Sequence, residues 1–312
     1  MLQSKKDEKF THPFKTLQGK ERAYVDLTAL KTLWINTGTR CNLTCENCYI
    51  ESSPTNDRLE YITNEEVLPF LEEIKSENYP VEYIGLTGGE PFLNPEITKI
   101  LSTILKHDFE VLVLTNAYRV INRHLDELVK IKEIYGDKLH IRVSLDHHTL
   151  DIHEEQRGKG TFNKTLEQIK WLCDQSFNIS IAGRSLTNES LEQEKECYQN
   201  LFKKWNIPLS LSDKKIVVFP EMDLNRDVPE ITTECWSILN KSPNDQMCAT
   251  ERMIVKRKGD ASVTVLPCTL LAYDEQFNLG STLKDSKSRV QLNHKFCAQF
   301  CVLGGASCSS AK

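Results

Sequence analysis

Eleven cysteines in a chain of 312 residues indicate metal chemistry, and their positions are more informative than their number. Cys41, Cys45 and Cys48 form a C-x3-C-x2-C loop. Three thiolates this close in sequence can bind one metal ion or one cluster. A structural zinc site normally has four ligands, and a four-iron cluster normally has four thiolates. The loop therefore predicts either an iron–sulfur cluster with one open iron or a zinc site that takes its fourth ligand from elsewhere.

A second group of cysteines lies near the end of the chain. It comprises Cys248, Cys268, Cys297, Cys301 and Cys308. Five thiolates suit one auxiliary cluster with a spare cysteine, and the alternative is a structural zinc site. Cys173 and Cys197 fall in helical patterns instead, where cysteine usually acts as a small core residue.

The composition excludes several classes of protein. Lys and Arg number 39 against 44 Asp and Glu, and the resulting net charge of −5 argues against a surface that generally coats nucleic acid. No stretch approaches the ~20 apolar residues of a membrane helix, and the N-terminus lacks the apolar segment of a secretory signal. We therefore expect a cytoplasmic protein with no membrane partner. In that reducing compartment, clustered cysteines indicate metal ligands rather than disulfides.

From about residue 31 the chain alternates between short apolar or β-branched runs and longer amphipathic runs. Strands are predicted at 31–36, 81–86, 109–114, 139–144, 179–183 and 216–219. Helices are predicted at 64–78, 94–107, 163–176 and 189–205, the second with Asn94 as N-cap and Pro95 at its first position. Repeated strand–helix units predict a parallel sheet, and six units are too few to close an eight-fold barrel. The expected fold is α/β, a partial (β/α)6 TIM-like barrel with an irregular, cysteine-rich C-terminal lobe.

Polar and small residues follow nearly every predicted strand. The cysteine loop follows the first strand, and Gly88-Gly89-Glu90-Pro91 follows the second. Later strands end at Asn116, at Ser144-Leu145-Asp146, at Gly183-Arg184 and in the segment 219–223. Ligands of parallel α/β proteins bind beyond the carboxyl ends of the strands, so these groups should meet at one mouth. Gly89 is expected to let the backbone approach the ligand closely, so that any side chain there would intrude on it.

The C-x3-C-x2-C loop, the aromatic Tyr49 after it and the Gly88-Gly89-Glu90-Pro91 segment together resemble the radical S-adenosylmethionine (SAM) superfamily over about residues 30–223. The resemblance implies that Cys41, Cys45 and Cys48 hold a [4Fe–4S] cluster whose fourth iron binds SAM. It implies SAM-binding roles for Gly88, Gly89, Glu90, Pro91, Asn116, Ser144 and Arg184. Such enzymes reductively cleave SAM to a 5′-deoxyadenosyl radical, which abstracts hydrogen from the substrate.

The cysteine-rich tail resembles the SPASM and twitch extensions of the same superfamily, which hold auxiliary [4Fe–4S] clusters. This resemblance implies metal-binding roles for Cys248, Cys268, Cys297, Cys301 and Cys308. We predict an N-terminal extension at 1–30, a radical SAM core at 31–223 and an auxiliary-cluster domain at 224–312. The expected partners are a small-molecule or peptide substrate and a low-potential electron donor such as flavodoxin or ferredoxin. The competing hypothesis is a non-catalytic zinc-binding protein.

Overall fold

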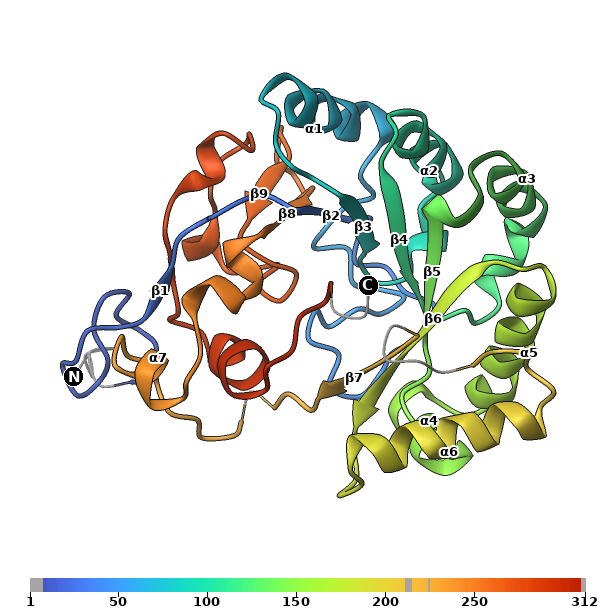
Figure 1. Cartoon of the computed structure of the whole chain (residues 1–312). Helices are drawn as coiled ribbons and strands as arrows, with labels where there is room; N and C mark the ends of the chain where they lie inside the picture. The colour runs from blue at the N-terminus through green and yellow to red at the C-terminus, as the bar shows by residue number, and fades with distance from the viewer. Residues whose placement is uncertain (1–7, 211–214, 224, 310–312) are drawn as a thin grey trace.

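An eight-stranded sheet forms the centre of the molecule, with the strand order β7-β6-β5-β4-β3-β2-β8-β9 (Figure 1). The computed structural model describes residues 8–210, 215–223 and 225–309. The strands are β2 (Thr32–Asn36), β3 (Tyr83–Thr87), β4 (Glu110–Thr115), β5 (Leu139–Ser144), β6 (Asn178–Ser185), β7 (Ile216–Pro220), β8 (Glu251–Val255) and β9 (Thr264–Leu266). Strands β2 to β8 pair in parallel, and β9 runs antiparallel to β8. The sheet is open, because its edge strands are β7 and β9.

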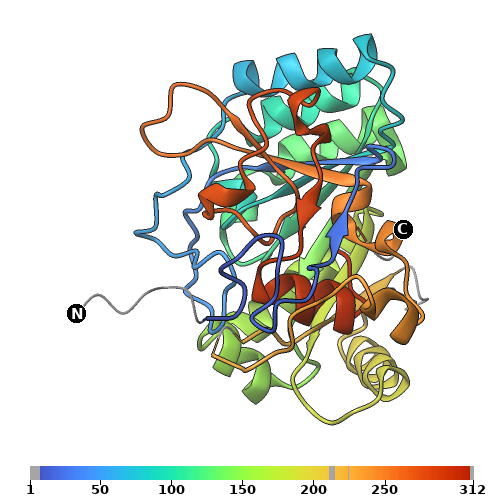
Figure 2. The same ribbon diagram turned by 90° about the vertical axis from the view of Figure 1, so that its left-hand side faces the viewer.

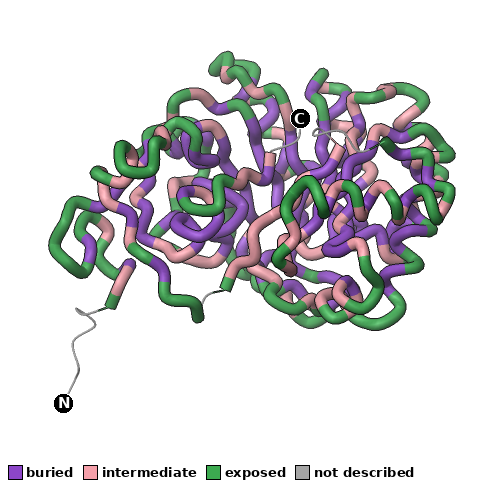
Figure 3. Tube along the Cα trace, turned by 60° about the horizontal axis from the view of Figure 1, so that its bottom comes forward, coloured by how far each residue is buried: buried purple, intermediate pink, exposed green. Residues whose placement is uncertain are grey.

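Helices between the strands cover one side of this sheet, as Figure 1 shows. They are α1 (Asn64–Ser76), α2 (Ile97–Lys106), α3 (Leu125–Tyr135), α4 (Leu150–Arg157), α5 (Thr161–Asp174) and α6 (Leu191–Lys204). Helix α1 illustrates the local cause, because Thr63 and Glu66 form a capping box at its start and Phe70 and Ile74 lie on its buried face. The outer helical turns are exposed (Figure 3), whereas most residues of β2, β3 and β4 are buried.

The two faces of the sheet belong to two hydrophobic cores, since successive residues of a strand point to opposite sides. Leu33 and Ile35 of β2 pack in the core beneath the helices. Trp34, between them, packs in a second core that is formed largely by the C-terminal segment and includes Leu266 and Phe300. The inner face of the sheet is therefore filled by the tail, which lies in front of the sheet in Figure 2.

The C-terminal segment also extends the sheet itself. Strand β8 pairs in parallel with β2, and Thr32 lies opposite Glu251. The same segment contains the short helix α7 (Cys235–Ile238) and a π-helix at Cys297–Leu303. Strand β10 (Val290–Gln291) pairs with β1 (Tyr24–Val25) in a separate two-stranded ribbon. The predicted boundary at 224 falls on a residue outside the described ranges, as do residues 1–7 of the predicted extension, and the division into domains stays a prediction.

All six predicted strands are present, and their ends differ from the predicted ones by at most two residues. The predicted start of the second helix is wrong, because α2 begins at Ile97 rather than after Asn94. The Asn94 side chain instead accepts a hydrogen bond from the Glu96 N–H and donates to the carbonyls of Thr37 and Ile62. Asn94 therefore ties the loop after β3 to the loop after β2.

Candidate active site

The three cysteines of the loop after β2 line one cavity of about 190 Å³ at the carboxyl ends of the strands. The Leu43 N–H donates to the Cys41 sulfur at 3.4 Å, and the Ser52 N–H donates to the Cys48 sulfur at the same distance. Burial raises the pKa of the Cys41 thiol to about 12. A thiolate at this position therefore needs a nearby positive charge, which a bound metal supplies.

The cysteine loop is not the most closely spaced group of potential metal ligands. In the described ranges, one group of three potential ligands has all its ligand atoms within 4.8 Å of one another, and that group contains no cysteine. Zn–S bonds of about 2.3 Å would bring the thiolates of a tetrahedral zinc site to about 3.8 Å from each other, so the side chains of the loop would have to move to bind one zinc ion.

Gly88 and Gly89 support the cysteine loop through close backbone contact. The Gly89 N–H donates to the Gly38 carbonyl at 2.9 Å, and the Glu90 N–H donates to the Arg40 carbonyl at 3.1 Å. A Cβ atom at Gly89 would lie 2.3 Å from the Arg40 carbonyl oxygen. Such a side chain would therefore meet the backbone that precedes Cys41, and its expected intrusion on the ligand stays a prediction.

Glu90 and Pro91 lie behind the cavity wall rather than on it. The buried Glu90 carboxylate accepts hydrogen bonds from the Thr115 hydroxyl and the Asn116 N–H, both at 2.8 Å. Burial raises the pKa of this carboxyl to about 7. Asn116 does line the cavity, and its side-chain amide lies 3.6 Å from the Cys41 sulfur. Glu90 therefore fixes the segment that presents Asn116 to the cysteine.

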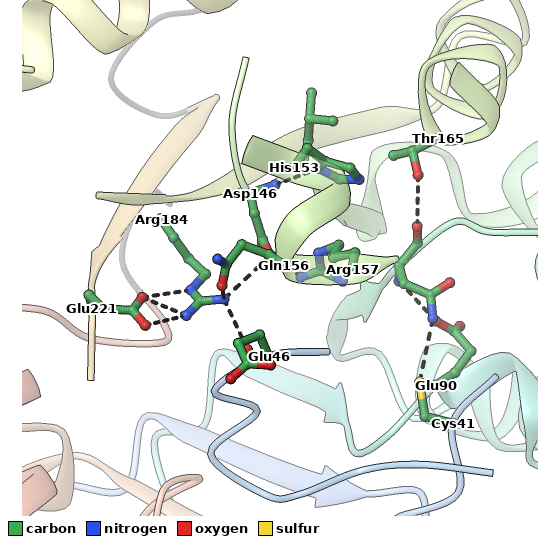
Figure 4. Close-up of polar contacts among 12 residues, drawn as sticks. Cys41, Glu46, Glu90, Asp146, His153, Gln156, Arg157, Thr165, Arg184 and Glu221 are labelled. Carbon is green, nitrogen blue, oxygen red and sulfur yellow. Dashed lines mark hydrogen bonds and ion pairs between the residues drawn. The ribbon is translucent and has the colours of Figure 1, made fainter. Parts of the chain in front are cut away.

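Ser144 and Arg184, at the ends of β5 and β6, line the same cavity. Nη2 of Arg184 lies 2.5 Å from Oε2 of Glu221, and its Nη1 donates to the Gln156 side chain at 3.0 Å (Figure 4). The guanidinium of Arg184 is thus already held in an ion pair at the rim of the cavity. Its predicted contact with the SAM carboxylate stays a prediction.

A buried ion pair lies beside Arg184. Nη2 of Arg157 lies 2.9 Å from Oδ1 of Asp146, and Nη1 of Arg184 lies 3.6 Å from Oδ2 of the same carboxylate. Burial, the largest single effect, would raise the pKa of Asp146, but the charge and hydrogen bond of Arg157 together with the charge of Arg184 outweigh it and lower the pKa. The His153 ring accepts the Asp146 N–H at 3.2 Å. The cavity wall therefore carries guanidinium groups close to the cysteines, which suits an anionic cluster and a carboxylate ligand.

The cysteine loop is also tied to the far side of the cavity. The Glu46 N–H donates to the Gln156 carbonyl at 2.8 Å, and the Asn47 side chain donates to Oε1 of Glu221 at 2.9 Å. Arg184 adds a longer contact to the Glu46 carbonyl at 3.4 Å. These contacts link the loop after β2 to helix α4 and to the end of β7.

Four of the five tail cysteines line a second, smaller cavity, and the fifth does not. Cys248, Cys268, Cys297 and Cys301 face this cavity together with apolar side chains such as Leu271 and Phe296. Cys308 lines the larger cavity instead, with its sulfur 3.1 Å from the Thr269 hydroxyl. The geometry favours the first four as ligands of one cluster and Cys308 as the spare cysteine.

A buried arginine accompanies the smaller cavity. Arg252 is fully buried, and its Nη1 donates to the Cys248 carbonyl at 2.7 Å. Its Nη2 is buried and has no hydrogen-bond partner among the residues that the structure describes. A cluster held by four thiolates is anionic, so a buried guanidinium with an open donor fits it well.

Sequence reasoning missed two residues that line or tie the cavity. Arg142 lies within β5, lines the cavity and donates to the Cys308 carbonyl at 2.7 Å. The alternation in LHIRVS was the available signal, because it places Arg142 with His140 and Ser144 on the face of the strand opposite to Ile141 and Val143. Glu221 was included in a strand-end segment, but nothing in its local sequence indicates its pairing with Arg184.

An open parallel α/β sheet with a three-cysteine cavity at its carboxyl edge defines an enzyme of the radical SAM class. The radical SAM superfamily profile matches residues 35–196, which is more than half of the chain. The chain therefore belongs to the radical SAM superfamily, and its cysteine-rich tail is a SPASM-like extension. Members of this superfamily hold a [4Fe–4S] cluster and bind SAM.

Two relatives and one solved structure show what the chain is similar to. It is 34% identical over 144 residues to the antilisterial bacteriocin subtilosin biosynthesis protein AlbA of Bacillus subtilis. The aligned region covers 46% of this chain and 30% of AlbA. It is 24% identical over 153 residues to the mycofactocin maturase MftC of Mycolicibacterium smegmatis. This second aligned region covers 49% of this chain and 37% of MftC. The chain thus spans well under half the length of either relative.

The fold is similar to that of SuiB of Streptococcus suis bound to SAM. The two share 16% sequence identity with a TM-score of 0.58, over 81% of this chain and 63% of SuiB. A further structure shows SuiB bound to the precursor peptide SuiA, with a TM-score of 0.58.

In the described part of the chain, no helix combines the length and apolar character that a membrane crossing requires.

Proposed function

We propose that this protein cleaves SAM reductively at a [4Fe–4S] cluster held by Cys41, Cys45 and Cys48. The convergence of these three cysteines with Gly88, Gly89, Asn116, Ser144 and Arg184 on one cavity carries the proposal. When bound, the cluster supplies one low-potential electron at short range to the sulfonium of SAM. A donor such as flavodoxin or ferredoxin would deliver that electron.

The residues of this chain have separate tasks in the proposed reaction. The Gly88-Gly89 backbone braces the cysteine loop, and Glu90 holds the segment that carries Asn116. Arg184 and Ser144 are the proposed partners of the methionine carboxylate, for which a guanidinium offers a planar pair of donors. The tail covers the inner face of the sheet and excludes water from the cavity, which protects a reactive radical.

We further propose that the tail forms an auxiliary-cluster domain and that the substrate is a peptide. Cys248, Cys268, Cys297 and Cys301 share one small apolar cavity, which supports a second [4Fe–4S] site beside the first. AlbA and MftC are named for the biosynthesis of a bacteriocin and the maturation of mycofactocin, and SuiB was solved with its precursor peptide. These relatives favour a peptide over a small molecule as the source of the abstracted hydrogen.

Anaerobic incubation with SAM and dithionite tests the cleavage step, with 5′-deoxyadenosine as the measured product. The wild-type protein should form it, and the triple variant Cys41→Ala/Cys45→Ala/Cys48→Ala should not. The triple variant should also lose roughly four irons per chain and keep the auxiliary iron. Cys173→Ala is the matched control, because Cys173 lies in α5 and packs against the helix-facing core. Unchanged iron and product in the triple variant would reject the proposal.

A further inference from the structure

A cluster of three side chains lies outside the proposed active site. His147 and His148 follow β5 directly after Asp146, and Glu189 lies shortly before helix α6. Nε2 of His147 is 3.4 Å from Oε2 of Glu189, and Nε2 of His148 is 3.1 Å from the same oxygen. Two loops at the ends of β5 and β6 thus bring two imidazoles and one carboxylate together.

The spacing of these atoms suits one metal ion. The three ligand atoms of His147, His148 and Glu189 all lie within 4.8 Å of one another. In the described ranges, no other group of three potential metal ligands is spaced this closely. Zn–N and Zn–O bonds of about 2.0–2.2 Å in a tetrahedral site place neighbouring ligand atoms about 3.3 Å apart. The distances of 3.1 and 3.4 Å match this value, so an ion would need little movement of the protein.

Burial provides a second, independent observation. His147 is 2% exposed, and its Nε2 makes no hydrogen bond within the described part of the chain, although it lies 3.4 Å from Oε2 of Glu189. A buried polar atom without a partner is costly, and a cation at this point would satisfy it. On the other side of the ring, Nδ1 lies 2.8 Å from the Thr149 hydroxyl. Nδ1 also accepts the Thr149 N–H at 3.1 Å, so binding an ion through Nε2 would require this contact to give way and the hydrogen to move to Nδ1.

Solvent can reach the cluster through His148. This residue is only partly buried and lines an open cavity of about 620 Å³ together with Thr149, Lys204 and Trp205. The three protein ligands would leave a coordination position for water, as three-ligand zinc sites do.

We propose that His147, His148 and Glu189 bind a divalent transition-metal ion, and that zinc is the best match to this ligand set. The ion would join the loop after β5 to the loop before α6. Asp146, which contacts Arg157 and Arg184, directly precedes the two histidines, so the ion would position the rim of the SAM cavity without touching SAM. The inference does not depend on the proposed function.

A metal-free arrangement makes the opposite prediction. The Thr149 N–H also approaches Nδ1 of His147, at 3.1 Å. If Nδ1 accepts that hydrogen bond, then Nε2 carries the hydrogen, and both histidines direct their N–H groups to Glu189 with no ion between them.

Zinc binding to the iron-replete protein separates the two arrangements. Protein purified without oxygen is dialysed against zinc, and zinc and iron are measured together. Wild type should bind one zinc per chain with no loss of iron, and the zinc X-ray absorption edge should show nitrogen and oxygen ligands only. Glu189→Gln should weaken zinc binding at least tenfold, and His148→Ala should do the same. Glu192→Gln, at an exposed position at the start of α6, should bind zinc as wild type does.

The opposite results are equally clear. Zinc bound through sulfur, zinc bound at the expense of iron, or equal zinc binding by wild type and Glu189→Gln would each overturn the proposal. Using two variants guards against misfolding, because His148 is partly exposed and Glu189→Gln preserves the shape of the side chain. A wild-type protein that binds no zinc would establish the metal-free arrangement.

Discussion

Replacing Gly89 with alanine should damage the metal centre without touching a metal ligand. The new Cβ would lie 2.3 Å from the Arg40 carbonyl oxygen and 2.6 Å from the Arg40 carbonyl carbon, whereas ordinary contacts begin at 3.4 Å. The obstruction is backbone, so no rotamer change can relieve it, and the segment leading into Cys41 must shift by about 1 Å. Overpacking of this kind costs about 1–3 kcal/mol.

The informative measurement is iron content and SAM affinity alongside thermal stability. Gly85→Ala is the matched control, because Gly85 lies on β3, the strand before Gly89, and its Cβ would lie 2.2 Å from the ring of Trp34 on the neighbouring strand β2 rather than against the cysteine loop. Both variants should melt at a lower temperature, by about 2–4 °C for each kcal/mol. Only Gly89→Ala should also lose core-cluster iron and bind SAM at least tenfold more weakly. Wild-type iron and SAM affinity in Gly89→Ala would refute the reasoning.

Other substitutions test the remaining contacts. Arg184→Ala should weaken SAM binding roughly ten- to hundredfold, because a charge-assisted hydrogen bond contributes ~1.5–3 kcal/mol; unchanged affinity with a lower melting temperature would make Arg184 a structural residue. Glu221→Gln should instead strengthen SAM binding in the same titration, because it releases the Arg184 guanidinium. Arg252→Leu should make the midpoint potential of the auxiliary cluster more negative, as measured by EPR-monitored redox titration, because it removes a buried positive charge. His153→Gln should flatten the fall in melting temperature below about pH 6.5, because burial lowers the pKa of His153 to about 4 and its protonation disfavours the folded state.

The parallel sheet could be predicted because each strand is marked locally. Runs such as EVLVLT in β4 are apolar and rich in β-branched residues, and the helices between them carry periodic apolar faces. Once the strands are parallel, their carboxyl ends must meet at one edge, so the convergence of the cysteine loop, Gly88 and Asn116 follows from topology alone. For the same reason, most predicted cavity residues lie where the sequence indicated.

Long-range pairing was not predictable in the same way. Strand β8 pairs with β2, from which it is separated by more than two hundred residues in the sequence. Its own sequence, ERMIV, does not indicate which strand it pairs with. The Arg184–Glu221 ion pair likewise depends on the ends of β6 and β7 lying side by side. Glu90 lies in the predicted segment, but its role as a buried acceptor behind the cavity depends on the loop that carries Asn116. Side-chain roles that arise from two distant segments leave little trace in either one.

The position of the tail brings residues of both cysteine groups into the core on the inner face of the sheet. The tail fills the inner face of the sheet, so the cavity is enclosed between the cysteine loop after β2 and the segment that ends near Cys308. Arg142 of the sheet reaches across to the Cys308 carbonyl, which fixes this segment against the cavity. A tail in this position places Cys308 on the wall of the same cavity as the three cysteines of the loop. Loss of the tail should therefore expose the inner face of the sheet, including Trp34, as well as remove a cluster.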